Sequence, residues 1–273
     1  MKEIIIFTAI AGVILLLVAA FWIGIIERKY RVSGDVTERI RILLITDLHS
    51  CFYGKEQTAL LKKITACAPD LICMSGDIYD DKNPPEAVEA LLKGLEETGC
   101  PVYYAPGNHE YRTDDIGAVL ALFERYGATV LIGESVKAVT AGGTLLLSGI
   151  GDPEGVGAEE WQAQLDAVSA EAKASGYFSI LLSHRPERVE AYQNSAFDLV
   201  LCGHAHGGQW RIPLLMNGLL APNQGFFPKY AGGQYVLSKR TVMIVSRGLA
   251  LNNPFPRIFN PPELVIIDVE KKT

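Results

Sequence analysis

Cysteine is scarce in this chain, and an excess of positive charge is absent. The 273 residues include five cysteines, an odd number without paired spacing, which does not indicate a disulfide framework. The formal net charge is −6, so the chain offers no basic field for a nucleic-acid polymer. No internal repeat or low-complexity tract stands out. These absences argue against a disulfide scaffold and against a protein that binds nucleic acid.

Histidine is equally scarce, and all five residues of this type stand in short motifs that are typical of metal ligands. With the other ligands that they need, the motifs are Asp47-Leu48-His49, Gly76-Asp77, Gly107-Asn108-His109-Glu110, Ser183-His184 and Gly203-His204-Ala205-His206. Hard divalent cations prefer carboxylate and carbonyl oxygens, and borderline cations accept imidazole. The combination predicts an enzyme with two divalent metal ions, for example manganese, iron or zinc.

The N-terminal segment carries a long apolar run. No charged residue interrupts Ile4 to Ile26, a stretch long enough as a helix to cross a hydrocarbon core of about 30 Å. We therefore expect one uncleaved transmembrane helix, with anchor and flank in residues 1–30 and a polar linker in residues 31–39. A cleaved signal peptide is the alternative, although the apolar run continues through Phe21, beyond the poor cleavage site before it.

Charges on the two sides of this run predict its orientation. Lys2 precedes the run, while Arg28, Lys29 and Arg31 follow it. Positive charge favours the cytoplasmic side of a membrane. The sequence thus predicts a single-pass membrane protein whose catalytic domain, residues 40–273, is cytoplasmic.

Several short apolar runs end where a histidine or aspartate motif begins. They cover residues 40–46, 71–75, 102–105, 178–183 and 198–202. Segments predicted to be helical lie between them, at residues 56–67, 86–97, 116–126 and 159–174. Open α/β sheets bind ligands at the carboxyl ends of their strands, so we expect the motifs to meet at one rim. Residues 207–234, rich in glycine, proline and aromatics, are predicted to form a long functional loop.

The spacing within the first motifs suits metal binding. Asp47 and His49 lie two residues apart as the chain leaves a strand, so both can point to one ion. Asp77 follows a glycine at a turn, where its two oxygens can each take a different ion. A shared carboxylate is the usual way to hold two ions about 3.5–4 Å apart.

The later motifs complete the ligand set. Asn108 supplies a neutral carbonyl oxygen, and His204 and His206 are predicted to face different ions. Each residue alone has a simpler explanation, since a single buried histidine such as His184 is more often a hydrogen-bonded core residue. The joint occurrence of all the motifs, each at a strand end, favours the metal site.

The series D-L-H, G-D, G-N-H-E, S-H and G-H-A-H resembles the calcineurin-like metallophosphoesterase superfamily over about Ile40 to Val269. The resemblance implies an α/β fold, a four-layer α/β/β/α sandwich with two mixed sheets, here preceded by the N-terminal transmembrane helix. It implies one metal ion held by Asp47, His49, Asp77 and His206. It implies a second ion held by Asp77, Asn108, His184 and His204.

The resemblance also implies a catalytic residue. His109 corresponds to the family's histidine that contacts the departing or transferring phosphoryl oxygens, and Glu110 or Asp80 is expected to orient it if either lies near enough. Arg112 and Arg247 are candidates to hold a second phosphate, although each can equally be a surface ion-pair residue.

The motif that begins at Gly203 continues through Gln209-Trp210 into Arg211, and this extension resembles a membrane-associated bacterial branch of the superfamily. That branch includes cell-wall-associated phosphoesterases and proteins similar to UDP-2,3-diacylglucosamine pyrophosphohydrolases. The expected substrate is a phosphodiester or pyrophosphate of a lipid or a nucleotide-sugar lipid, met near the membrane to which the N-terminal helix binds. One alternative is an extracytoplasmic phosphodiesterase or phosphatase that acts on cell-envelope polymers. Another is a non-catalytic scaffold, which the complete ligand set opposes.

Overall fold

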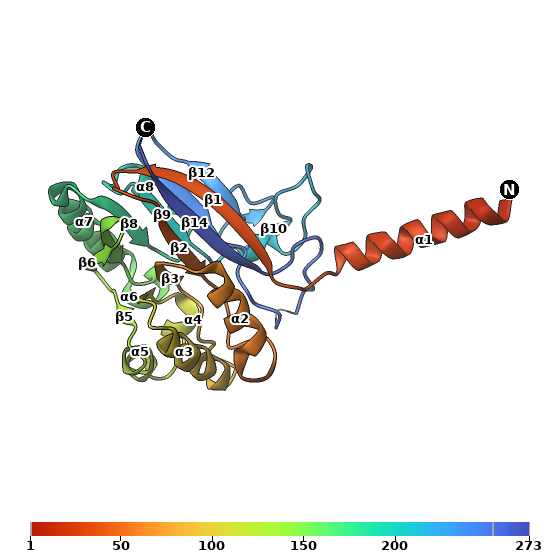
Figure 1. The fold of residues 1–273 in the computed structure, drawn as a ribbon, viewed down its shortest axis with the longest axis horizontal. Coiled ribbons are helices and arrows are strands. Elements are labelled where there is room, and N and C mark those ends of the chain that lie inside the picture. Colours follow the sequence, from red (N-terminus) through yellow and green to blue (C-terminus); the bar gives the residue numbers. More distant parts are fainter. Residues whose placement is uncertain (1, 253, 273) are drawn as a thin grey trace.

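The structure is a computed structural model that describes residues 2–252 and 254–272. Two six-stranded sheets form the body of the molecule (Figure 1). The first sheet has the strand order β1 (Ile26–Gly34), β14 (Glu263–Lys271), β2 (Ile40–Ile45), β3 (Leu71–Ser75), β4 (Val102–Ala105) and β5 (Thr129–Val130). The second has the order β12 (Gly233–Val236), β13 (Val242–Val245), β9 (Leu199–Cys202), β8 (Phe178–Leu182), β7 (Gly143–Gly149) and β6 (Glu134–Thr140).

Both sheets are mixed. Strands β2, β3, β4 and β5 run parallel in the first sheet, and β14 pairs antiparallel with β2. In the second sheet β13, β9, β8 and β7 are parallel, while β12 and β6 pair antiparallel at the two edges. The parallel strands of each sheet therefore end at a common edge, and these edges carry the metal-ligand motifs.

Side chains alternate between an inner and an outer core, as the period of a strand requires. In β2, Ile42 and Leu44 join a buried cluster with Ile180 of the second sheet. Leu43 and Ile45 point the other way and join the cluster beneath the helices of the first sheet. The near-continuous apolar sequence of β2 thus reflects a strand buried on both faces.

Helices cover the outer face of each sheet. The apolar clusters place α2 (Thr58–Cys67), α3 (Glu86–Thr98) and α5 (Ile116–Arg125) on the first sheet, and α7 (Ala158–Ser175) and α8 (Val189–Gln193) on the second. Short elements complete the chain: η1 (Lys55–Gln57), α4 (Asn108–Tyr111), α6 (Pro153–Val156), η2 (His206–Gly208), β10 (Leu220–Ala221) and β11 (Gly225–Phe226). The arrangement confirms a mixed α/β sandwich with helices outside two facing sheets.

Helix α3 shows how the sequence produces one of these layers. Val88, Leu91, Leu92 and Leu95 recur at helical spacing and are buried. Gly99 ends the helix with φ 67°, a left-handed conformation that glycine adopts without a steric penalty. The apolar stripe therefore covers the sheet, and the charged residues between its members face outward.

The predicted membrane anchor is wrong. Helix α1 (Lys2–Ala20), which extends away from the sandwich in Figure 1, ends before Phe21. Within residues 2–252 and 254–272, no helix combines the length and the apolar character that crossing a membrane requires. The physical reason is that the apolar run does not form one helix: its last residue, Ile26, opens strand β1 and donates its N–H to the Pro262 carbonyl at 2.9 Å. The predicted single-pass membrane localisation fails with the anchor.

The predicted flank and linker also require correction. Strand β1 pairs in parallel with β14 from Ile26 beside Glu263 to Gly34 beside Lys271. As an edge strand it alternates exposed charged residues with inward ones such as Val32, which is buried. This polar composition concealed a strand within residues that the sequence had assigned to the flank (1–30) and the linker (31–39).

Candidate metal centre

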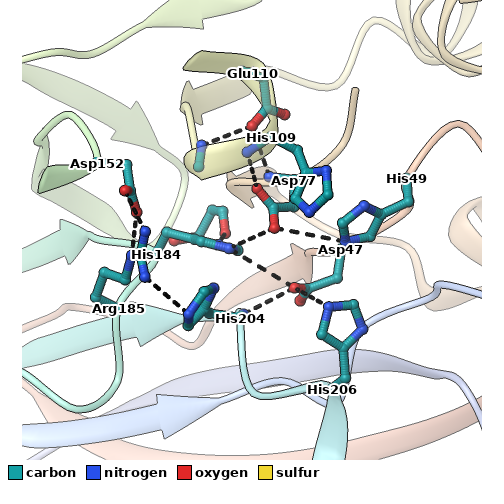
Figure 2. A network of polar contacts seen from close by, with 12 residues as sticks. Asp47, His49, Asp77, His109, Glu110, Asp152, His184, Arg185, His204 and His206 are labelled. Atoms are coloured by element: carbon teal, nitrogen blue, oxygen red, sulfur yellow. Dashed lines mark hydrogen bonds and ion pairs between the residues drawn. The ribbon is translucent and has the colours of Figure 1, made fainter. Parts of the chain in front are cut away.

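The metal-ligand motifs meet at the carboxyl ends of the parallel strands. Asp47 follows β2, Asp77 follows β3 and Asn108 lies just beyond β4. His184 follows β8 and His204 follows β9, so both sheets contribute. Figure 2 shows these carboxylate and imidazole groups pointing toward one another.

Two buried groups of side chains share one aspartate. In the first, Asp47, His49, Asp77 and His206 each place a ligand atom within 4.8 Å of the others, and in the second, Asp77, His184 and His204 do the same. The side-chain amide of Asn108 lies 3.0 Å from His204 Nδ1. The structure thus brings together every residue predicted as a metal ligand, in two sets that share Asp77.

Only one carboxylate oxygen of Asp77 faces the two groups of ligands. Its Oδ2 lies 3.0 Å from His184 Nε2 and 3.6 Å from His49 Nε2. Its Oδ1 accepts the backbone N–H of His109 at 2.9 Å. The sequence suggested one oxygen for each ion, whereas here one oxygen faces both groups and the other fixes the orientation of the carboxylate.

Hydrogen bonds determine which imidazole nitrogen faces Asp77. His49 Nδ1 lies 2.8 Å from Asp80 Oδ2, and His184 Nδ1 lies 2.8 Å from the Ser75 carbonyl oxygen. Because a carboxylate and a carbonyl only accept, each Nδ1 carries a proton, which leaves Nε2 as the ring atom that a metal ion could bind. Metal-binding histidines usually donate their second ring N–H in this way.

Buried atoms without a hydrogen-bond partner test whether the site suits metal ions. Within the described residues, four of these atoms belong to predicted ligands: Asp47 Oδ2, His49 Nε2, His184 Nε2 and His206 Nδ1. An unsatisfied buried polar group costs about 1–3 kcal/mol. Divalent cations would satisfy lone pairs of this kind, and the mixture of Asp, Asn and His suits manganese, iron or zinc. The residues present therefore fit the two ions that the motifs predict.

The backbone is strained at the same residues. Positive φ angles occur at Asp47 (51°), His49 (48°), Asp77 (53°), His204 (66°) and His206 (46°). Such a conformation costs on the order of 1–3 kcal/mol for a residue other than glycine and persists only where the surroundings impose it. Its concentration at the strand ends supports a functional role for these turns.

Charge and burial shift the pKa values of the groups at the metal centre in opposite directions. Burial alone would lower the pKa of His184, but the Asp77 carboxylate beside it raises that pKa to about 10. Burial alone would raise the pKa of Asp77, but the neighbouring His184 holds it well below the usual range. Burial also raises the pKa of Asp47. The two buried carboxylates thus require positive charge between them.

Comparison with known proteins identifies the family. Residues 40–208, more than half of the chain, match the family model described as Calcineurin-like phosphoesterase. The chain belongs to this family. It is therefore a metal-dependent phosphoric ester hydrolase, and the family fold implies divalent metal ions at the candidate site.

Relatives of this phosphoesterase support the assignment. An uncharacterized metallophosphoesterase of Campylobacter jejuni is 30% identical over 243 residues, which cover 87% of this chain but only 61% of the relative. The phosphodiesterase YaeI of Escherichia coli is 27% identical over 202 residues, which cover 71% of this chain and 70% of the relative. The crystal structure of a dimetal phosphatase from Danio rerio matches with a TM-score of 0.53 and 11% identity, covering 82% of this chain and 91% of that one. At that identity the structural match shows the fold alone.

The predicted catalytic histidine of the phosphoesterase lies beside the metal centre. His109 Nδ1 is 2.5 Å from Asp81 Oδ1 and 3.4 Å from Asp80 Oδ2. Its Nε2 lies 3.2 Å from Arg112 Nη1. Asp81, which the sequence did not single out, therefore makes the closest contact with the ring, while Asp80 lies closer to His49, at 2.8 Å from its Nδ1.

Glu110 has a different role from the one expected. Its buried carboxylate accepts backbone N–H groups of Gly107, Asp77, Ile78 and Tyr79 at 2.7–3.0 Å. Burial and the nearby Asp77 raise its pKa to about 7. Glu110 thus stabilises the turn that carries Asp77, and of the two carboxylates expected to orient His109, Asp80 is the one that contacts its ring.

The two arginines proposed for substrate lie in different places. Arg112 donates from Nε and Nη2 to Glu154 at 2.6 and 2.8 Å, and its Nη1 reaches His109. Arg247 Nε instead lies 3.3 Å from Glu263 Oε2. The structure brings Arg112 to the metal centre and does not bring Arg247 there.

Sequence reasoning missed a group of residues behind His204. Arg185 is buried, and its Nη1 lies 3.0 Å from His204 Nε2. Asp152 and Asn223 contact the same guanidinium at 2.5–2.7 Å. Figure 2 shows Arg185 between Asp152 and His204. No motif marks these residues, because only the folded chain brings them together.

A pocket of about 490 Å³ opens onto the centre. Polar residues on its lining include His49, Asp80, His109 and His206. Apolar residues on its lining include Leu220, Pro222 and Phe255. The pocket therefore combines reactive groups with an apolar wall.

Proposed function

We propose that this phosphoesterase hydrolyses a phosphodiester or pyrophosphate bond at a pair of divalent ions, and that its substrate is a lipid-linked or nucleotide-sugar-lipid phosphate. The single observation that supports the dinuclear reaction best is the position of Asp77 Oδ2, which lies against the Nε2 atoms of His49 and His184, one from each of two buried groups.

The residues around the ions have separate tasks. Bound at this site, two divalent cations would supply Lewis-acid stabilisation of the phosphoryl oxygens and acidify the attacking water. Asp81 holds one ring nitrogen of His109, so His109 Nε2 is available to hold a proton for the leaving oxygen. Arg112 presents its Nη1 beside that nitrogen, where a guanidinium can bind a phosphoryl oxygen.

The apolar wall supports the lipid part of the proposal. Leu220, Pro222 and Phe255 line the same pocket as the catalytic histidine. Phe226 and Phe227, on the adjoining loop, are 71% and 70% exposed. Exposed aromatic side chains beside an apolar pocket suit a substrate whose phosphate is attached to an acyl chain.

Kinetic comparison of substrates tests this proposal. We expect the full chain, loaded with manganese, to cleave UDP-diacylglucosamine with a kcat/KM at least about tenfold above that for soluble phosphodiesters, equivalent to about 1.4 kcal/mol. Leu220→Ser should lower kcat/KM for the acylated substrate and leave soluble esters unaffected. Val236→Ser, at an exposed position on β12, is the matched control.

Two results would count against this substrate class. Faster cleavage of every soluble ester would contradict the lipid part of the proposal. Preferential cleavage of a teichoic-acid-like polymer would favour the alternative of an enzyme that acts on envelope polymers.

A further inference from the structure

The ring of His204 is held from behind by two side chains. Its Nε2 lies 2.7 Å from Asn223 Oδ1 and 3.0 Å from Arg185 Nη1. Its other nitrogen, Nδ1, lies 3.0 Å from the side-chain amide of Asn108, on the side of the metal centre. The position of the ring proton therefore decides whether His204 can act as a metal ligand.

The guanidinium of Arg185 is fixed in place. Its Nε and Nη2 donate to the two oxygens of Asp152 at 2.5 and 2.6 Å, and both side chains are buried. Asp152 also caps helix α6, where its Oδ1 accepts the N–H of Glu154 at 2.9 Å. The remaining nitrogen, Nη1, donates to Asn223 Oδ1 at 2.7 Å.

These contacts determine the tautomer of His204. An arginine only donates, so the Asn223 atom that faces Arg185 Nη1 must be the amide oxygen. That oxygen only accepts, so its shorter contact, 2.7 Å from His204 Nε2, favours a proton on Nε2, with Arg185 Nη1 donating to Asn223 rather than to the ring 3.0 Å away. His204 Nδ1 is then an unprotonated acceptor that faces the side-chain amide of Asn108. That nitrogen can then bind a cation held beside Asn108.

Asn223 belongs to the long glycine-rich and aromatic loop. It stands in the turn between β10 and β11 with φ 57°, a conformation that asparagine tolerates better than most residues. The same turn includes Pro222, which lines the substrate pocket. One loop therefore reaches both the pocket wall and the back of a metal ligand.

We propose that Asn223, held by Arg185 and Asp152, is a positioning residue that sets the tautomer of His204 and so aims Nδ1 at one of the two ions. The inference rests on the proposed dinuclear function, because it requires an ion beside Asn108 and His204. Loss of a partner behind a metal ligand typically costs about 10–100-fold in metal affinity.

The test measures metal binding by the full chain without substrate. Metal-free wild type, Asn223→Gly, Asn223→Asp and Asn217→Gly are titrated with Mn²⁺ by calorimetry, and with Co²⁺ by visible absorption. Glycine suits the positive φ at position 223, so removal of the side chain should not disturb the turn. Asn217, on the same loop, contacts Arg211 and Tyr235, which makes its variant a matched control.

We expect wild type and Asn217→Gly each to bind two ions, and the affinity for each ion to be the same in both proteins. Asn223→Gly should retain one ion at wild-type affinity and bind the other about 10–100-fold more weakly, with a changed Co²⁺ spectrum for that ion. Asn223→Asp should retain near-wild-type affinity and spectrum, since its carboxylate oxygen can accept the same proton from His204.

Wild-type affinity for both ions in Asn223→Gly would overturn the inference, and so would equal weakening in Asn217→Gly or in Asn223→Asp. None of these three results would contradict the proposed function, because wild type would still bind two ions. A wild-type chain that binds fewer than two ions would instead contradict the proposed function, and the inference would fail with it.

Discussion

At the scale of single residues, the centre depends on which atom each side chain turns inward. His49 and His184 donate hydrogen bonds from Nδ1 to the Asp80 carboxylate and the Ser75 carbonyl. Their Nε2 atoms converge on Asp77 Oδ2. The sequence predicted these ligands because each is part of a short motif at a strand end. It did not predict Asp81 beside His109, because Asp80 and Asp81 are adjacent and only the turn geometry distinguishes them.

Asp77→Asn should remove both ions and the activity together. The substitution retains the size of the side chain but takes away the negative charge at the position that both groups share. We expect the metal content of the purified variant to fall below one ion per chain. Hydrolysis of bis-p-nitrophenyl phosphate should fall at least about 10³-fold, equivalent to about 4 kcal/mol. A variant with two ions and normal turnover would refute the shared ligand.

His109→Ala should separate catalysis from metal binding. The ring of His109 lies beside the centre but is held by Asp81 and Arg112, so its removal should leave the metal content unchanged. The value of kcat should fall about 10²–10⁴-fold, as expected for a lost acid or base. Asp81→Asn should lower kcat by a smaller factor with little change in KM. A near-normal kcat of His109→Ala on a slow ester would reject its assigned role.

At the scale of elements, the strands that carry the motifs were predicted closely. Strand β4 has the predicted limits, and β3 ends where expected, because compact apolar runs between turn residues are the clearest strand signal. Strand β1 was missed since it is an edge strand with alternating charge, next to an apolar run that suggested a membrane helix. An apolar run by itself does not reveal where a helix ends and a strand begins.

Truncation tests the assignment of β1 to the sandwich. Removal of residues 2–19 takes away most of α1 and should leave the unfolding free energy of the sandwich nearly unchanged. Removal of residues 2–34 also takes away β1, exposes the edge of β14 and loses the burial of Val32. We expect this longer truncation to lower the unfolding free energy by at least about 2 kcal/mol. Chemical denaturation measures both, and equal stability of the two truncations would support the linker prediction instead.

At the scale of the whole molecule, two sheets are needed to complete one site. Asp47 and Asp77 follow strands of the first sheet, while His184 and His204 follow strands of the second. Residues far apart in the sequence therefore meet only when the sandwich is closed. The resemblance in motifs anticipated this fold, but the contacts among Asp152, Arg185 and Asn223 depend on how loops pack and leave no sequence pattern.

Metal removal should therefore destabilise the entire sandwich. Ions that bind only the folded chain stabilise it by about 2.7 kcal/mol at a concentration one hundred times the Kd. Addition of a chelator should lower the Tm of wild type by several degrees and leave the Tm of Asp77→Asn unchanged. Calorimetric scans of the two proteins, each with and without chelator, make the comparison. An unchanged wild-type Tm would show that the ions do not couple the sheets.

Anomalous diffraction from crystals grown with Mn²⁺ tests the central claim most directly. The account predicts two manganese peaks about 3.5–4 Å apart, both adjoining the Asp77 carboxylate, with Asp47 beside one and His184 beside the other. A single peak, or peaks that lie away from Asp77, would contradict a dinuclear centre built from both sheets.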